Sequence, residues 1–151
     1  MLERLARWLR VLGYDVVFAN LSDPDGARHL REAASQGRII LSRNAHLATR
    51  RLEGDALFVE SLTPLAQLSE VIERLQLRGP WKLFSRCMVC NTPLVGTSDA
   101  GGTSSPRGET TPGVPTRRCP ACDRLYWEGV HTRRMRAALR RSLGPAFIEV
   151  T

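Results

Sequence analysis

Four cysteines are the residues whose type and spacing point most directly to chemistry. They form two Cys-x-x-Cys pairs, and each pair fits a short turn that presents two thiolates to a common centre. Four thiolates around one Zn²⁺ make a tetrahedral, coordinatively closed site, so such an ion would hold structure and not catalyse. Two disulfides or two redox pairs are the alternative, although Cys-x-x-Cys pairs suit a metal in a reduced cytosol better. The predicted zinc ligands are Cys87, Cys90, Cys119 and Cys122.

Acidic residues in the first half of the chain are the second group that could carry out chemistry. A metal-dependent nuclease needs three or four carboxylates at the C-terminal edge of a parallel sheet, where they hold Mg²⁺ or Mn²⁺ that activates water. After the strand expected over 38–42 the chain supplies Asn44 and no acid, and an amide is a poorer ligand for a hard cation. Three acids on loops are also common in any soluble domain, so spacing leaves both alternatives open. The catalytic candidates by position are Asp15, Asp23 and Asp25.

Arginines are the third group, and they are unevenly distributed. The chain has 22 Lys and Arg against 15 Asp and Glu, and Lys82 is the single lysine. Residues 1–80 carry 11 cations against 10 acids (net +1), whereas residues 81–151 carry 11 against 5 (net +6). Arginine pairs bidentately with phosphate and stacks on bases, so a cationic surface in the second part points to nucleic acid. A GC-rich genome also raises arginine content, but it would not segregate the charge. Five arginines within residues 133–141 could equally form a solvated helix face.

The elements that must position these residues alternate between helix and strand in the first half. The alternation indicates βαβ units and a parallel sheet. The first element is a helix, so the strand that would normally precede it is absent, and we expect either a start inside the domain or a lost first strand. The first predicted helix has leucines on one stripe and Arg4, Arg7 and Arg10 on the other side, and Gly13 ends it. A buried strand over 15–19 follows, and then a helix that runs from a cap at Ser22 or Asp23 to Gln36. The remaining predicted elements are a strand over 38–42, a short helix over 44–52, a strand over 56–60, and a helix that Pro64 opens and Gly79-Pro80 ends.

The character of the chain changes after Pro80. Residues 96–116, between the cysteine pairs, contain 16 Gly, Ser, Thr or Pro out of 21, and we expect a disordered insert because they bury little apolar area. A strand over 124–129 and an Arg-rich helix over 132–143 follow. No stretch is apolar enough to span a membrane and no signal peptide is visible. The Arg-rich start would suit a mitochondrial transit peptide, but it runs directly into the folded pattern, so we expect a cytoplasmic protein.

Short stretches spread along the whole chain carry the pattern of a known family. They are Met1-Leu2, Leu5 to Arg10, Leu12 to Asp15, Gly37 to Arg43, Gln67-Leu68, Ser85 to Cys87, Cys90-Asn91 with Leu94, and Cys119 and Cys122 with Tyr126 to Gly129, His131 and Met135. Together they resemble the Mut-seven C-terminal ribonuclease family, in which a PIN-like nuclease domain precedes a zinc ribbon. The resemblance implies a PIN-like parallel sheet with flanking helices over residues 1–80, without its first strand. Over residues 81–151 it implies the zinc ribbon and its C-terminal helix.

The resemblance implies RNA as the partner and Mg²⁺ or Mn²⁺ as the cofactor of hydrolysis. The family pattern has an acid before Met1, an Asp at the position of Asn44, and an acid near Gly26, where Asp25 is one residue off. We therefore expect an RNA-binding protein that hydrolyses RNA if active. The alternative is a non-catalytic adaptor for RNA or a ribonucleoprotein, and a DNA-binding ribbon protein is a third possibility. The candidates for contact with RNA are Arg7, Arg43, Arg133, Arg136 and Arg140.

Overall fold

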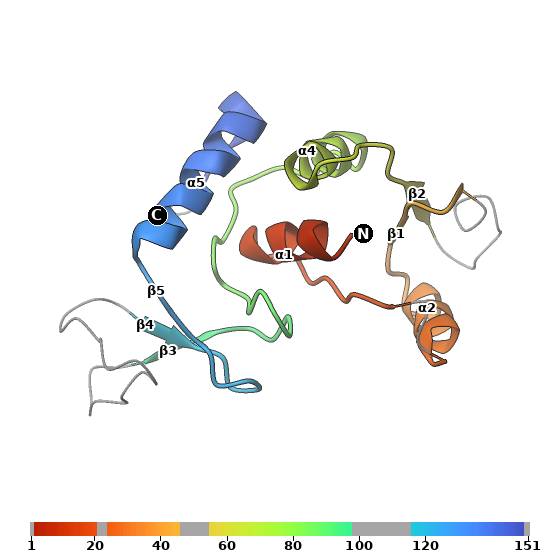
Figure 1. The fold of residues 1–151 in the computed structure, drawn as a ribbon, viewed down its shortest axis with the longest axis horizontal. Coiled ribbons are helices and arrows are strands. Elements are labelled where there is room, and N and C mark those ends of the chain that lie inside the picture. The colour runs from red at the N-terminus through yellow and green to blue at the C-terminus, as the bar shows by residue number, and fades with distance from the viewer. Residues whose placement is uncertain (1, 21–23, 46–54, 98–115, 150–151) are drawn as a thin grey trace. The chain divides into compact units, whose positions relative to one another are not determined.

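The computed structural model describes residues 2–20, 24–45, 55–97 and 116–149. The chain forms two compact units. The N-terminal unit contains Met1–Ala6 and Val17–Leu77, and the C-terminal unit contains Arg7–Val16 and Arg78–Thr151. Helix α1 (Glu3–Val11) therefore contributes residues to both units (Figure 1).

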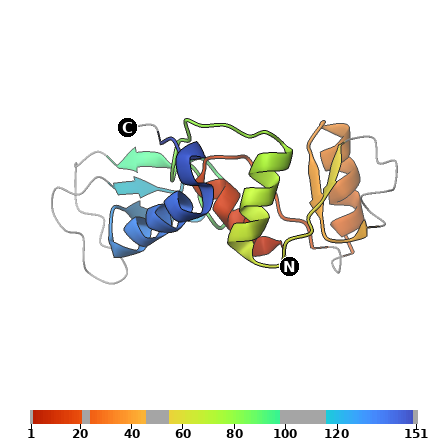
Figure 2. The same cartoon turned by 90° about the horizontal axis from the view of Figure 1, so that it is seen from above.

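A two-stranded parallel sheet organises the N-terminal unit. Strand β1 (Ile40–Ser42) pairs with β2 (Ala56–Phe58), with Leu41 opposite Leu57. Helix α2 (Gly26–Ser35) lies beside these strands in both views (Figures 1 and 2). The parallel pairing confirms the predicted α/β class, in which consecutive strands are joined by a crossover and share one carboxyl edge.

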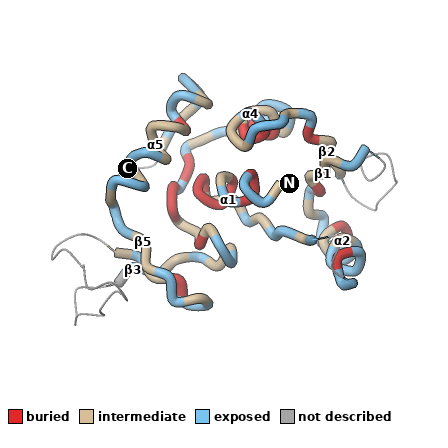
Figure 3. Tube along the Cα trace, in the orientation of Figure 1, coloured by how far each residue is buried: buried red, intermediate tan, exposed pale blue. Residues whose placement is uncertain are grey.

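Helix α4 (Pro64–Arg74) follows the sheet and has one buried face (Figure 3). Thr63 is its N-cap residue, and Pro64 occupies the first helical position, where a missing N–H costs nothing. The prediction that Pro64 opens this helix is confirmed, although the helix ends at Arg74, well before Gly79-Pro80. Its buried residues recur at helical spacing: Gln67, Leu68, Val71 and Ile72.

The strand predicted over residues 15–19 is wrong. The segment is not in a sheet, and Val17 and Phe18 are 64 % and 42 % exposed. Side chains take the place of a partner strand at Val16, whose N–H donates to Asn91 Oδ1 and whose carbonyl accepts from Arg10 Nε. The apolar run was misleading because a strand needs a neighbouring strand as well as apolar residues.

Two other predictions fall partly or wholly on residues that the structure does not describe. Most of the helix expected over 44–52 lies outside the described residues, as do the proposed caps Ser22 and Asp23. Where α2 is described, Asp25 is its N-cap residue.

A three-stranded antiparallel sheet forms in the C-terminal unit, in the order β3 (Val95–Thr97), β4 (Thr116–Arg118) and β5 (Leu125–Trp127). The two ends of the segment predicted to be disordered are therefore paired strands, with Gly96 opposite Arg117 and Thr97 opposite Thr116. The rest of that segment, residues 98–115, lies outside the described residues. Helix α5 (Val130–Leu143) begins two residues before the predicted start at 132, and a 3₁₀ turn, η1 (Gly144–Ala146), follows it.

Aromatic and glycine residues fix the core of the C-terminal unit. The Trp81 indole is buried, donates to the Tyr14 hydroxyl at 3.0 Å and stacks on Phe147. Gly13 ends the first helix with φ +97°, and a Cβ there would approach the Lys82 carbonyl oxygen to 2.9 Å, so both the conformation and the space require glycine. In the part of the chain that the structure describes, no helix combines the length and the apolar character needed to cross a membrane.

Candidate functional site

The two Cys-x-x-Cys turns have the same backbone construction. Asn91 N–H donates to the Cys87 carbonyl and Asp123 N–H donates to the Cys119 carbonyl, both at 3.0 Å. The residue after each second cysteine has a positive φ, +70° at Asn91 and +63° at Asp123. Asn and Asp tolerate this left-handed conformation better than other side chains, so the sequence carries the signal for both turns.

The two turns bring the four cysteine sulfurs together. The Sγ atoms all lie within 4.8 Å of one another, and Cys90 Sγ is 3.3 Å from that of Cys119 and 3.6 Å from that of Cys122. A tetrahedral ion with metal–sulfur bonds of about 2.3 Å requires sulfur–sulfur separations of roughly 3.8 Å. Within the described ranges, these residues are the one group of three or more His, Cys, Asp or Glu that could hold a metal ion such as zinc.

Neighbouring groups polarise the thiols of this cluster. Hydrogen bonds with the Thr92 hydroxyl and backbone lower the pKa of Cys90 to about 6. The Arg124 N–H lowers the pKa of Cys122, but burial and the adjacent sulfurs outweigh it and raise that pKa to about 12. Without a metal ion, the four crowded thiols therefore ionise unequally, because neighbouring negative charges repel one another. A bound dication would offset this repulsion and favour the thiolate form of all four.

Tyr126 supports the first turn from β5. Its hydroxyl accepts from Met88 N–H at 3.2 Å and lies 3.0 Å from Cys87 Sγ, so its own hydrogen is available to the sulfur. Burial raises the pKa of Tyr126, which keeps the hydroxyl protonated and able to donate. Hydrogen bonds of this kind orient metal ligands.

Arg10 is a structural residue that the amphipathic pattern placed on the solvent side of the first helix. It is only 6 % exposed. Its NH1 donates to the carbonyls of Met88 and Val89, both at 2.9 Å, and its Nε donates to Val16 at 2.8 Å. The guanidinium therefore holds the first cysteine turn against residues 7–16. Helical spacing alone could not reveal the Met88 and Val89 carbonyls as partners, because they lie more than seventy residues away.

Asp15, a predicted catalytic residue, contacts the same turn. Its Oδ1 accepts from Asn91 Nδ2 at 2.6 Å, and Oδ2 lies 4.0 Å from the Arg86 guanidinium. Arg86 in turn donates to the Asn91 carbonyl at 2.9 Å. The carboxylate is thus placed beside the cysteine cluster, in the C-terminal unit.

Of the other two predicted catalytic acids, the structure describes Asp25, which belongs to the N-terminal unit. Asp25 is the N-cap residue of α2, although its side chain makes no capping hydrogen bond, and it forms an exposed ion pair of 3.2 Å with Arg28. Asp23 lies outside the described residues. No group of three acids is formed among the described residues, and the catalytic assignment of Asp15, Asp23 and Asp25 stays a prediction.

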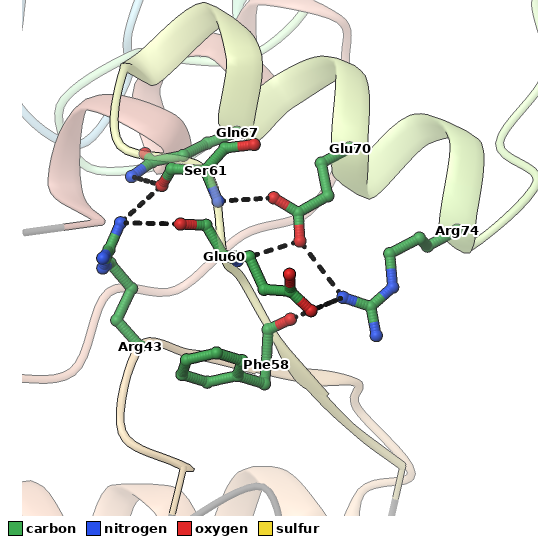
Figure 4. A network of polar contacts seen from close by, with 7 residues as sticks. All are labelled: Arg43, Phe58, Glu60, Ser61, Gln67, Glu70 and Arg74. Carbon is green, nitrogen blue, oxygen red and sulfur yellow. Dashed lines mark hydrogen bonds and ion pairs between the residues drawn. The ribbon is translucent and has the colours of Figure 1, made fainter.

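The carboxyl edge of the β1–β2 sheet, where an acidic site was expected, carries arginine (Figure 4). Arg43 follows β1, and its NH1 donates to the carbonyls of Ser61 and, at 3.4 Å, Glu60 beyond β2. Gln67 Nε2, from α4, donates to the same Ser61 carbonyl at 3.0 Å. Asn44 follows Arg43, and its N–H donates to Ser42 Oγ at 2.9 Å.

Glu70 is the acid that reaches this edge from α4. Its Oε1 accepts from Glu60 N–H at 2.9 Å and from Arg74 at 3.1 Å, and its Oε2 accepts from Ser61 N–H at 2.8 Å. Burial opposes ionisation, but the two backbone donors and Arg74 prevail and lower the pKa of Glu70 from 4.5 to about 2. Both oxygens thus fix the chain after β2 to α4.

Replacing Glu70 with Gln should destabilise the N-terminal unit in a pH-dependent way. Because the folded-state pKa is lowered, the carboxylate contributes full stability above about pH 4.5 and loses it as the pH falls towards 2. At pH 7, E70Q should lower the free energy of unfolding by about 1–2 kcal/mol, since an amide group would face a backbone N–H and the partly exposed site screens the charge.

Urea unfolding followed by circular dichroism at several pH values tests this. The difference between E70Q and the unmodified protein should shrink between pH 4.5 and 2, and loss of any bound metal cancels in that difference. Glu73→Gln, an exposed change on the same helix, is the matched control. Equal effects of E70Q and E73Q would contradict the assignment.

The predicted RNA-contacting arginines differ in their surroundings. Arg7, Arg133 and Arg140 are exposed. Arg43 donates hydrogen bonds to the carbonyls of Glu60 and Ser61. Arg136 forms ion pairs with Glu128 at 2.7 Å and Glu149 at 3.0 Å, and its guanidinium lies over the Phe84 ring.

No curated protein and no solved structure matches the chain. A protein family does match, over residues 1–139, and its description is Mut7-C RNAse domain. This match includes both strands of the parallel sheet, all four cysteines and most of α5. The chain belongs to the Mut7-C RNAse domain family.

Proposed function

We propose that this protein binds RNA through its C-terminal unit. Helix α5 is the observation that carries the proposal. Its Leu139 is fully buried and its Arg136 is held by Glu128 and Glu149, which fixes one face of the helix to the unit. Four arginines on the same helix are exposed: Arg133, Arg134, Arg140 and Arg141.

A fixed helix with exposed guanidinium groups suits a phosphate backbone. Guanidinium pairs with phosphate oxygens, and the release of condensed counterions favours binding. The family supports RNA as the polyanion, since its description names an RNAse domain. Exposed Arg7 is a further candidate for contact, whereas Arg43 has internal partners and is a weaker one.

The ion at the four cysteines is, in this proposal, a structural Zn²⁺. Four thiolates are soft ligands that favour zinc and leave no open coordination position. The four thiols are free, which suits the reducing cytoplasm as the location.

Metal-dependent RNA hydrolysis is the second candidate function, with Mg²⁺ or Mn²⁺ as cofactor. It draws support from the family alone. The described acids weigh against it, because Asp15 contacts Asn91, Asp25 pairs with Arg28, and Asn44 stands where the family pattern has an acid. A non-catalytic adaptor for RNA or a ribonucleoprotein fits these contacts better.

The double variant R133A/R140A should weaken binding to a single-stranded RNA and flatten its salt dependence. Each lost phosphate contact lowers the slope of log affinity against log salt by about 0.7, so two contacts should lower it by roughly 1.4. Fluorescence anisotropy with a labelled oligoribonucleotide at several salt concentrations measures both effects.

Arg4→Ala with Arg31→Ala is the matched control, because it removes two exposed charges from the N-terminal unit. Arg136→Ala should instead lower the melting temperature, since its charge is paired internally. If R133A/R140A and the control have the same slope as the unmodified protein, α5 is a solvated face and the proposal is wrong.

A further inference from the structure

The three-stranded sheet of the C-terminal unit has two faces of different character. Directly paired residues in antiparallel strands share a face. Arg117 pairs with Tyr126, and the side chains of this face contact the rest of the unit: the Tyr126 hydroxyl lies 3.0 Å from Cys87 Sγ, and Arg117, although exposed, donates from NH1 to the Phe84 carbonyl at 2.9 Å. The opposite face is formed by the alternate residues: Val95, Thr116, Arg118, Leu125 and Trp127.

Trp127 is the prominent residue of this outer face. It is 50 % exposed, and so is Val95. By contrast, Trp81 is 3 % exposed and serves the core of the same unit. Although exposed, the indole of Trp127 packs against Gly129, the N-cap residue of α5, which restricts its orientation. A Cβ added at Gly129 would lie 3.2 Å from the indole Nε1.

Arginines are found on the same face of the sheet as Trp127 and on the helix that follows it. Arg118 shares its face of the sheet, and exposed Arg133 and Arg134 follow in the first two turns of α5. The acids nearby have partners: Asp123 pairs with Arg118 and Glu128 pairs with Arg136. The charges named here, on the outer face of the sheet and at the start of α5, therefore have a positive sum.

We propose that this outer face binds single-stranded RNA, with an unpaired base stacked on the Trp127 indole and the flanking phosphates near Arg133 and Arg134. The proposal rests on the RNA-binding function proposed above and specifies its substrate class. A base in a duplex is already stacked and cannot cover the indole, whereas a single strand can present one. Arginines on the same surface as an exposed aromatic ring favour a single-stranded nucleic acid, which carries both phosphates and bases, over an uncharged partner.

Binding measurements with full-length, metal-loaded protein test the proposal. The probes are a fluorescently labelled 12-mer oligouridylate and an RNA duplex of equal length. Trp127→Ala should weaken binding of the single strand by roughly five- to a hundredfold, as loss of one stacked base does. The salt slope should stay unchanged, since stacking releases no counterions. Trp127→Phe should retain most of the affinity, and the duplex should bind more weakly and respond little to either change.

Intrinsic fluorescence gives an independent readout. The single strand should quench tryptophan emission in the unmodified protein, and Trp127→Phe should remove this quenching while Trp8 and Trp81 still emit. Equal metal content and circular dichroism spectra of the variants establish that the unit is folded.

The outcomes separate this proposal from the one on which it rests. Single-strand binding that needs Arg133 and Arg140 but survives W127A would overturn the stacking site and leave RNA binding intact. Concentration-dependent self-association that W127A abolishes, without RNA-induced quenching, would show that a second copy covers the face. Failure of the unmodified protein to bind RNA would overturn both proposals.

Discussion

Cys119→Ser should unfold the C-terminal unit. Cys119 and Cys87 are fully buried, and the cysteine turns connect Arg10, β5 and the segment after Trp81. Structural zinc contributes of order 10 kcal/mol to the folding of such modules. The free energy of unfolding of a whole domain is only about 5–15 kcal/mol, so loss of the ion would remove most of it. A hydroxyl in place of a thiolate is a poor zinc ligand, so C119S should lose both the ion and the fold.

Elemental analysis of the purified protein should find one zinc per chain. Circular dichroism and the melting temperature report the loss of structure in C119S and after chelation. Val89→Ser, an exposed change inside the first cysteine turn, is the matched control because it keeps all four sulfurs. Protein purified without zinc, or C119S that melts like V89S, would contradict the structural role.

Unfolding should spread into the N-terminal helix. Residues 7–16 belong to the C-terminal unit, and Arg10 and Asp15 bind the first cysteine turn through side chains. Hydrogen exchange in C119S should therefore lose protection at Leu9 to Leu12 as well as in α5. Protection that is lost in α5 but kept at these residues would show that the helix is stable without the metal.

Local signals account for the parts of the structure that could be predicted. The spacing of the cysteines predicted the cluster, and Asn91 and Asp123 supplied the left-handed residues that the turns require. Pro64 predicted the start of α4 because it prefers the first helical turn. The turns and the helix start depend on residues close in sequence, and the joining of the two cysteine pairs could be inferred because four thiolates suit one metal ion.

The parts that could not be predicted depend on distant partners. Residues 15–19 read as a strand, but Asn91 and Arg10 satisfy the Val16 backbone instead. Arg10 and Arg136 looked like surface charges, yet each has partners brought to it by the fold. Composition also could not locate the ends of the glycine-rich insert, because pairing with Arg117 makes Gly96 part of a strand.

The unmodified protein should show little or no metal-dependent ribonuclease activity. A hydrolytic metal site concentrates negative charge, because Mg²⁺ gives up water reluctantly and prefers carboxylates. At the carboxyl edge of the β1–β2 sheet, Arg43 places a cation and Asn44 an amide, and Glu70 uses both oxygens on Glu60, Ser61 and Arg74. A dication would meet guanidinium groups here.

Asn44→Asp adds a single carboxylate and should raise Mn²⁺-dependent cleavage of a single-stranded RNA only slightly, because the Arg43 guanidinium still places positive charge at this edge. The assay compares Mn²⁺ with EDTA, and Glu73→Gln, purified in the same way, controls for contaminating nucleases. Asp15→Asn should change the stability of the C-terminal unit instead, since Asp15 accepts from Asn91. Robust EDTA-sensitive cleavage by the unmodified protein that is lost in Asp25→Asn, or in Asp15→Asn at an unchanged melting temperature, would show that these acids act in catalysis and that the enzyme hypothesis is right.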